Sequence, residues 1–305
     1  MRKGILIMAA LCVCCGKTEE PSAKAVEDSE TSVRIVLESV QGFRKSDVFI
    51  YDSTPLRRLR KHIQIKNVTN VNSDTVRTTL PEGDWTVTAV ADSPWEFNLD
   101  ALSGYEAFEA LEIPFGHDTP ERRIQSGNNT LSVREPGSEG SRGANSAAIG
   151  MVPLMSSIEV VEIRNMSGSL SAATPGLTAI ELYLTDASAG AGLCRASGFR
   201  PTEWLNRDGL SESDLASIPN PWLLYRRVSG TAGAGDLYPQ VSLYCYPNDA
   251  PAGDIASPRT GVTLRGTMNG RQCCWNAVLP AIPRGSALRV GFTLLSEDDF
   301  SYEVY

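Results

Sequence analysis

The sequence predicts a mainly β protein made of two domains, with only a few short helices. Short segments in which apolar and polar residues alternate are separated by turn residues, and the chain contains 26 glycines and 18 prolines. Stretches with helical spacing are few. A length of 305 residues suits two domains of ordinary size. A hydrophobic content of 42% provides the apolar residues that their cores need.

The formal net charge of -8 argues against a nucleic-acid partner. Binding to phosphate backbones needs clustered Lys and Arg. The one basic cluster, residues 56–62, is interpreted as a solvated loop or the edge of a sheet.

The N-terminus has the pattern of a secretory signal peptide. Arg2 and Lys3 precede an apolar run over residues 4–13, which is shorter than the roughly 20 residues of a membrane-spanning helix. Cysteines follow at once, as in the lipobox of bacterial lipoproteins, where cleavage before a cysteine leaves a residue that carries acyl chains. Two or more such chains hold a protein firmly to a membrane.

The acylated residue is predicted to be Cys15, with Cys14 as the alternative. Cys15 follows a small residue, whereas Cys14 follows the bulky Val13. Residues 1–14 are then the signal peptide, and the small, polar residues of 15–30 form a lipidated tether. An ordinary cleaved signal with chance cysteines is the competing interpretation.

Alternation of apolar and polar residues predicts the strands of the first half. In residues 32–40, Val33, Ile35 and Leu37 share one face. Further strands are predicted at residues 47–52, 63–65, 74–80, 85–91 and 128–135. Apolar residues at spacings of three predict a helix over residues 98–112.

Residues 136–150 are poor in large apolar side chains and are predicted to be a loop near the domain boundary. The predicted domains are residues 31–150 and 151–305. In the second half, a capping pattern predicts a short helix over residues 211–218, and Asn269-Gly270 predicts a type I′ hairpin turn. Strands are predicted at residues 158–163, 177–184, 222–228, 240–246, 260–268, 271–279 and 286–295.

The cysteines beyond the signal leave two alternatives open. Disulfides are permitted outside the cytoplasm, but buried free thiols fit the apolar sequence contexts of Cys245 and Cys274 equally well. The same question applies to Cys194 and Cys273.

Catalytic and metal-binding motifs are missing from the sequence. The two histidines, His62 and His117, lack zinc-site spacing, and no nucleophile elbow is present. The acidic run 297–299 is interpreted as a solvated turn. The expectation is therefore a protein that is not an enzyme, with no catalytic residue, no metal and no cofactor. A hydrolase with two facing carboxylates is the remote alternative.

Taken in order, the predicted segments resemble the fimbrillin-like family, whose members build or anchor surface fimbriae of anaerobic bacteria. The similarity covers nearly the whole mature chain. It is carried by the lipobox, by residues 32–40 and 47–52, by GDWTVTAVA at 83–91, by residues 178–185, 203–209 and 244–248, and by the closing segment 260–295.

The resemblance implies two tandem antiparallel β-sandwich domains and assembly by strand donation. In the family, the first strand completes the N-terminal sandwich, an Arg-specific protease cuts after it, and another subunit supplies a replacement strand. Residues 32–40 stand at the place of that strand, with Val33, Ile35 and Leu37 as its apolar side chains, and Arg44 stands at the place of the cut. The implied protein is a fimbrial (pilus) subunit or anchor on the cell outer membrane, with other fimbrial subunits as partners, that supports adhesion.

A second function remains open, because a sandwich scaffold does not determine function. A surface lipoprotein that binds glycans or host proteins would need exposed aromatic side chains in a groove. The candidates are Trp204, Trp222 and Tyr225, each of which is expected in the core by default.

Overall fold

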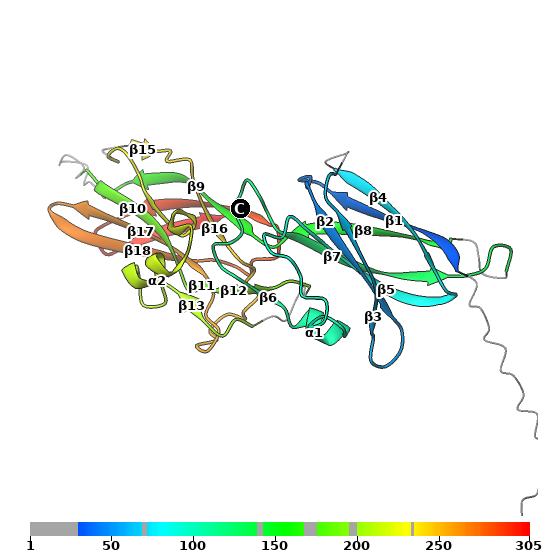
Figure 1. The fold of residues 1–305 in the computed structure, drawn as a ribbon. Helices are drawn as coiled ribbons and strands as arrows, with labels where there is room; N and C mark the ends of the chain where they lie inside the picture. Colours follow the sequence, from blue (N-terminus) through cyan, green and yellow to red (C-terminus); the bar gives the residue numbers. More distant parts are fainter. Residues whose placement is uncertain (1–29, 69–71, 139–142, 168–175, 195–199, 233–234) are drawn as a thin grey trace, which may run out of the picture.

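The computed structural model describes residues 30–68, 72–138, 143–167, 176–194, 200–232 and 235–305. The predicted signal peptide, most of the tether, and Cys14 and Cys15 lie outside the described residues. Strands dominate the described part and only two short α-helices occur in it, so the mainly β fold class is confirmed. Figure 1 shows two β-rich halves arranged end to end, with the C-terminus near their junction.

One sheet of seven strands forms the first half, in the order β3-β2-β5-β7-β8-β1-β4. Its strands are β1 (Thr31–Ser39), β2 (Ser46–Asp52), β3 (Leu59–Ile65), β4 (Ser73–Leu80), β5 (Gly83–Ala91), β7 (Gln125–Val133) and β8 (Ser146–Pro153). The basic cluster therefore lies largely on β3, at an edge of this sheet. A sheet edge was one of the two interpretations that the sequence suggested for it. A core of buried apolar side chains fills this half, including Val33, Ile35 and Leu37.

Strand β8 was not expected, because residues 136–150 were predicted to be a loop. Along β8 buried and exposed residues alternate strictly, but the exposed ones include Ala148 and Gly150, so the segment looks poor in large side chains. It pairs with β1 in parallel, with Leu37 opposite Ile149. The purely antiparallel arrangement is therefore wrong for this pair, and also for β9 (Ser156–Asn165) and β19 (Ala287–Leu294).

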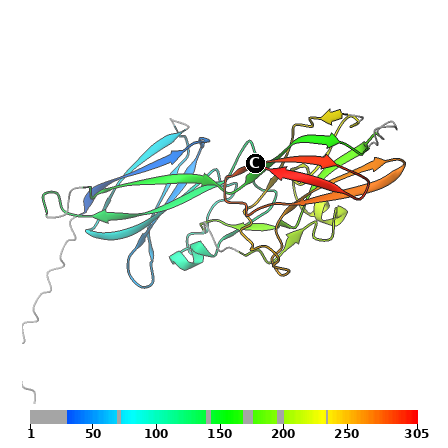
Figure 2. The ribbon, with the colours of Figure 1, turned by 180° about the vertical axis from the view of Figure 1, so that it is seen from behind.

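Two sheets pack face to face in the second half. The four-stranded sheet has the order β14-β10-β17-β18, and the five-stranded sheet is built around β9 and β19 with β15, β16 and β20. The remaining bounds are β10 (Thr178–Thr185), β14 (Tyr225–Arg227), β15 (Gly235–Leu237), β16 (Val241–Cys245), β17 (Gly261–Met268), β18 (Arg271–Val278) and β20 (Phe300–Val304). Figure 2 shows β19 and β20 from behind, in red.

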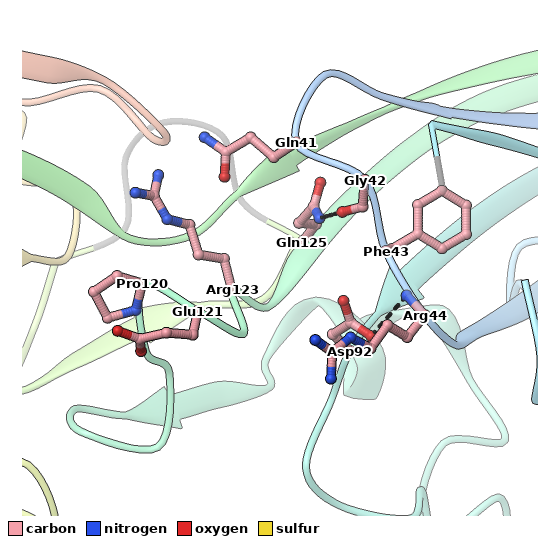
Figure 3. Close-up of a pocket in the computed structure, with 9 residues that line it drawn as sticks. All are labelled: Gln41, Gly42, Phe43, Arg44, Asp92, Pro120, Glu121, Arg123 and Gln125. Carbon is pink, nitrogen blue, oxygen red and sulfur yellow. Dashed lines mark hydrogen bonds between the residues drawn. The ribbon is translucent and has the colours of Figure 1, made fainter. Parts of the chain in front are cut away.

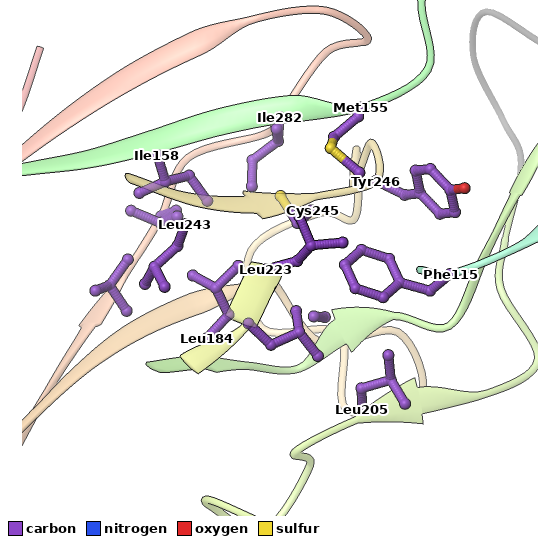
Figure 4. Close-up of a cluster of buried hydrophobic side chains, with 14 of the residues drawn as sticks. Phe115, Met155, Ile158, Leu184, Leu205, Leu223, Leu243, Cys245, Tyr246 and Ile282 are labelled. Carbon is purple, nitrogen blue, oxygen red and sulfur yellow. The ribbon is translucent and has the colours of Figure 1, made fainter. Parts of the chain in front are cut away.

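Large buried side chains join these two sheets. Figure 4 shows part of the cluster, in which Ile158 and Leu243 from one sheet approach Leu184 from the other. Phe115 meets Tyr246 edge to face, with ring centroids 5.3 Å apart. Because Phe115 follows β6 (Glu112–Pro114), a segment from the first part of the sequence belongs to this core.

Two short strand pairs connect the halves and the surface loops. β6 pairs with β12 (Gly190–Gly192), which joins residues on the two sides of the predicted boundary at 150. β11 (Ala187–Ser188) pairs with β13 (Trp204–Leu205). The boundary itself stays a prediction, and β8 runs across it.

The prediction of a helix over residues 98–112 is mostly wrong. Only α1 (Tyr105–Glu109) is α-helical in this range, because the backbone just before it pairs with the start of β3. The Ser103 carbonyl accepts a hydrogen bond from Leu59 N–H, and Gly104 forms a β-bridge with Arg58. β6 begins at Glu112 and ends the helical segment.

The second helix and the hairpin are confirmed. In α2 (Glu212–Ser217) the Ser211 side chain accepts a hydrogen bond from Asp214 N–H, which is the expected cap. Asn269 and Gly270 join β17 to β18 with φ values of 54° and 77°, as a type I′ turn requires. The strand predicted from residue 222 instead starts at β14, after a short 3-10 helix, Pro221–Leu223. Within the described residues, no helix has the length and apolar character needed to cross a membrane.

Candidate functional site

The first strand lies inside its sheet rather than at an edge. β1 is antiparallel to β4 on one side and parallel to β8 on the other. Since β4 is the last strand in the order, β1 is the only one of the described strands that pairs with it. Loss of β1 would therefore leave a gap between β4 and β8, with unpaired backbone groups on both walls.

The side chains of β1 fit this gap by alternation. Val33, Ile35 and Leu37 are 2%, 0% and 0% exposed, whereas Arg34 and Glu38 face solvent. Complete burial of a side chain such as Leu37 is worth about 1.5–3 kcal/mol. The structure thus places all three predicted residues together on the inward face of β1.

The end of β1 is fastened by polar contacts that the sequence did not reveal. Ser39 Oγ donates to Oε1 of Gln125, at 2.6 Å, and the amide of Gln125 donates to the carbonyl of Gly42 at 2.5 Å. Gln125 is 1% exposed and begins β7, 86 positions from Ser39. No local pattern marks such a long-range partner.

Arg44 lies in the loop 40–45 that joins β1 to β2. Its side chain is exposed, but its backbone is held: the N–H donates to Asp92 Oδ1 at 3.1 Å, and the carbonyl accepts from Val68 N–H at 3.1 Å. The preceding Phe43 is buried. A protease that needs an extended substrate would reach Arg44 only after this loop opens locally.

A small hollow lies beside this loop. It has a volume of about 180 Å³ and is lined on one side by Gly42, Phe43 and Arg44. Figure 3 shows Asp92 beneath Arg44, and Arg123 and Glu121 on the opposite side. Opening of the loop at this hollow would expose the peptide bond that follows Arg44.

The aromatic candidates for ligand binding are engaged with neighbours. Trp222 packs edge to face on Tyr244, with centroids 6.2 Å apart, and lies under the guanidinium of Arg226 at 4.6 Å. Tyr225 donates to Glu181 Oε1 at 2.6 Å. Trp204 is half-buried on β13. These contacts give Trp222 and Tyr225 structural roles on different elements.

The four described cysteines are free thiols. Of the two alternatives that the sequence left open, disulfides or free thiols, the structure has the free thiols. Cys245 and Cys273 are buried, Cys194 is half-buried and Cys274 is exposed. Burial raises the pKa of the thiols of Cys194 and Cys245 to about 12, so neither is a reactive thiolate near neutral pH.

The histidines are in separate places. His62 contacts Asp47 Oδ1 at 2.8 Å and stacks on Phe49, while His117 lies against Trp95. Among the described residues, no three His, Cys, Asp or Glu side chains are grouped as metal ligands would be. Glu297 accepts hydrogen bonds from the hairpin residues Asn269 and Arg271.

Comparison with known proteins identifies the fold. No protein-family model matches the sequence, and no curated protein sequence does either. Solved structures do match, over most of both chains. A protein of Bacteroides eggerthii with a provisional assignment to cell adhesion has a TM-score of 0.62 at 12% identity, over 90% of this chain and 95% of its own.

Two fimbrial proteins of Porphyromonas gingivalis are also similar. Fimbrillin FimA has a TM-score of 0.55 at 10% identity, over 89% of this chain and 96% of its own. The tip fimbrial protein Mfa3, with a C-terminal truncation, has a TM-score of 0.54 at 10% identity, over 90% of this chain and 99% of its own. The chain therefore has the fold of fimbrillins and related adhesion proteins, as its sequence motifs led us to expect.

Proposed function

We propose that this chain is a cell-surface fimbrial subunit or fimbrial anchor that assembles by strand donation and supports adhesion. The shared fold of fimbrial proteins supports this role. The observation that carries it is the placement of β1: a buried, internal strand that directly precedes a loop with an exposed arginine. The proposal assigns the chain no catalysis and no cofactor.

Strand exchange follows from the geometry of the gap. After cleavage behind Arg44, β1 would no longer be joined covalently to the rest of the sheet. It would be held by its two neighbouring strands, its inward side chains and the polar contacts of Ser39 and Gly42 with Gln125. A strand from another subunit could pair with β4 and β8 through main-chain hydrogen bonds and fill the sites of Val33, Ile35 and Leu37 with its own apolar residues. Subunits joined in this way would form a polymer.

Cleavage with an Arg-specific protease tests the proposal. We expect a new N-terminus at Lys45, followed by ladders or polymers, and suppression of both by a synthetic peptide of residues 31–40. An Arg44→Ala variant should resist this cut, whereas Arg77→Ala, which removes an exposed arginine on β4, should be cut as before. A soluble, unchanged monomer after complete release of β1 would rule out strand exchange.

Attachment to the outer membrane is tested separately. We propose that acyl chains on Cys15 hold the unprocessed protein there. Cys15→Ala should move the protein from the membrane fraction to the soluble fraction, while Cys14→Ala should have a smaller effect. If both variants stay fully bound to the membrane, neither cysteine is a required anchor and the proposed lipid attachment is wrong.

A further inference from the structure

An apolar pocket lies apart from β1 and its loop, on the segment between β5 and β6. It has a volume of about 330 Å³. Its apolar lining includes half-buried Trp95, Phe97 and Leu111 and buried Leu102 and Ile113. This volume is at the lower end of the range for small-ligand sites, about 300–1,000 Å³, and suits one or two side chains.

The pocket is held open by the core beneath it. Phe97 packs edge to face on Phe49, with ring centroids 5.1 Å apart, and Trp95 lies 5.1 Å from the His117 ring. Leu102 N–H donates to the Asn98 carbonyl at 3.2 Å. The wall near Ile113 is fixed by the pairing of β6 with β12. A pre-formed pocket costs little ordering when a ligand binds.

Its rim is acidic. Glu96 and Glu112 are exposed members of its lining, and none of the described lining residues is Lys or Arg. The sequence around the pocket also lacks basic residues, since no Lys or Arg occurs between Arg77 and Arg122. A ligand that places positive charge beside the apolar cavity would be favoured over one that places negative charge there.

We propose that this pocket binds a peptide segment of another protein, in which an apolar side chain enters the cavity and flanking Lys or Arg residues meet Glu96 and Glu112. The apolar area supplies affinity and the two carboxylates select the charge of the partner. This inference names a partner class for the adhesive role and rests on that role. Binding itself needs no strand exchange.

The test uses the mature chain, uncut at Arg44, and dye-labelled hexapeptides in about 150 mM salt, where distant surface charges are screened. The probe is Lys-Lys-Leu-Trp-Lys-Lys. One comparison peptide replaces the apolar pair, Lys-Lys-Ala-Ala-Lys-Lys, and the other reverses the charge, Glu-Glu-Leu-Trp-Glu-Glu. Fluorescence anisotropy should show that the probe binds more tightly than both.

Matched variants locate the site. Ala101 lines the pocket and is exposed, so Ala101→Phe should fill it and weaken probe binding about tenfold or more. Ala107 is exposed on α1 outside the lining, and Ala107→Phe should leave binding unchanged. Ala101→Met serves as a smaller filling variant, and an unchanged thermal midpoint shows that each variant is folded.

The charge is tested at the rim. Glu96→Gln with Glu112→Gln should weaken probe binding about threefold to tenfold, whereas Glu106→Gln on α1 should not. Equal binding of the alanine peptide would show attraction by net charge alone, and equal binding of the acidic peptide would show no charge selection. Either result, or binding unaffected by both substitutions at Ala101, overturns the inference. Failure here leaves the cleavage experiment at Arg44 informative, because the two readouts are independent.

Discussion

Arg284 Nη2 lies 2.8 Å from the Oγ of Ser126, a hydrogen bond between residues 158 positions apart. The same nitrogen donates to the carbonyl of Val152 at 3.1 Å. Arg284 belongs to the loop before β19, while Ser126 and Val152 belong to β7 and β8. This guanidinium therefore ties the second half of the chain to the seven-stranded sheet of the first, and burial lowers its pKa.

Replacement of Arg284 by Met should loosen this tie. The change leaves Ser126 and Val152 without their shared donor, and we expect the free energy of unfolding to fall by about 1–3 kcal/mol. As a control, Arg289→Met removes an arginine that is 58% exposed and paired with Glu159 at 3.3 Å. This loss should stay below about 1 kcal/mol. Urea unfolding curves of both variants measure these losses. Equal losses of the free energy of unfolding in the two variants would contradict the role given to Arg284.

Stability should depend on pH through Asp118. This carboxyl is 0% exposed, and burial is the main cause that raises its pKa from 3.8 to about 7, although Ile124 N–H donates to it at 2.8 Å. Because the folded state holds the proton more tightly, the contribution of Asp118 is complete below about pH 4 and is lost as the pH rises through 7. The loss is on the order of 4 kcal/mol at most.

The variant Asp118→Asn isolates this contribution. Between pH 4 and 7, the wild type should lose free energy of unfolding relative to Asp118→Asn, and above pH 8 the difference should be constant. Asp100→Asn, at an exposed aspartate, should keep the pH dependence of the wild type. Parallel wild-type and Asp118→Asn curves across this range would show that Asp118 does not titrate there.

Strands with strong alternation were predictable from the sequence, and those with weak alternation were not. Val33, Ile35 and Leu37 mark β1 because large apolar residues occupy three successive inward positions. In β8 one inward position is Ala147 and two outward ones are Ala148 and Gly150, so the contrast is small. Its parallel pairing with β1 depends on distant parts of the chain, which local patterns do not encode.

The candidate site was predictable only in its local part. β1 and Arg44 are close in the sequence, and their order was enough to suggest a strand followed by a cut. The loop 40–45 is fastened by Gln125 and Asp92, which lie at the ends of strands that are distant in the sequence. The pocket at Trp95 was missed because two of its residues, Leu102 and Leu111, fit the spacing of the predicted helix. Trp95 and Phe97 beside acidic residues were visible as a signal.

The β17–β18 turn should depend on Gly270. Its φ of 77° is left-handed, and no atom of the described residues lies within 4 Å of an added Cβ, so Gly270→Ala tests backbone strain. We expect a loss of about 1 kcal/mol in the free energy of unfolding. Gly150→Ala offers the matched control, because its added Cβ also meets open space but its φ is not positive. That change should be neutral or slightly stabilising, and equal losses at both positions would contradict the strain argument.

Leu37 should matter for both stability and strand exchange. It is 0% exposed, and Leu37→Ala should lower the free energy of unfolding by about 2–5 kcal/mol, because a cavity replaces packed atoms. Val40, next to the end of β1, is 99% exposed, and Val40→Ala should change little.

The same substitution made in the peptide separates an exchangeable strand from a permanent one. If residues 31–40 act as a plug, a peptide with Leu37→Ala should suppress polymers of the cleaved protein at least about 30-fold less well than the native peptide, since about 2 kcal/mol of binding energy is lost. The peptide with Val40→Ala should match the native one. A permanent strand would give no suppression by any of the three peptides, because loss of β1 would then unfold the half it belongs to and leave no groove to fill.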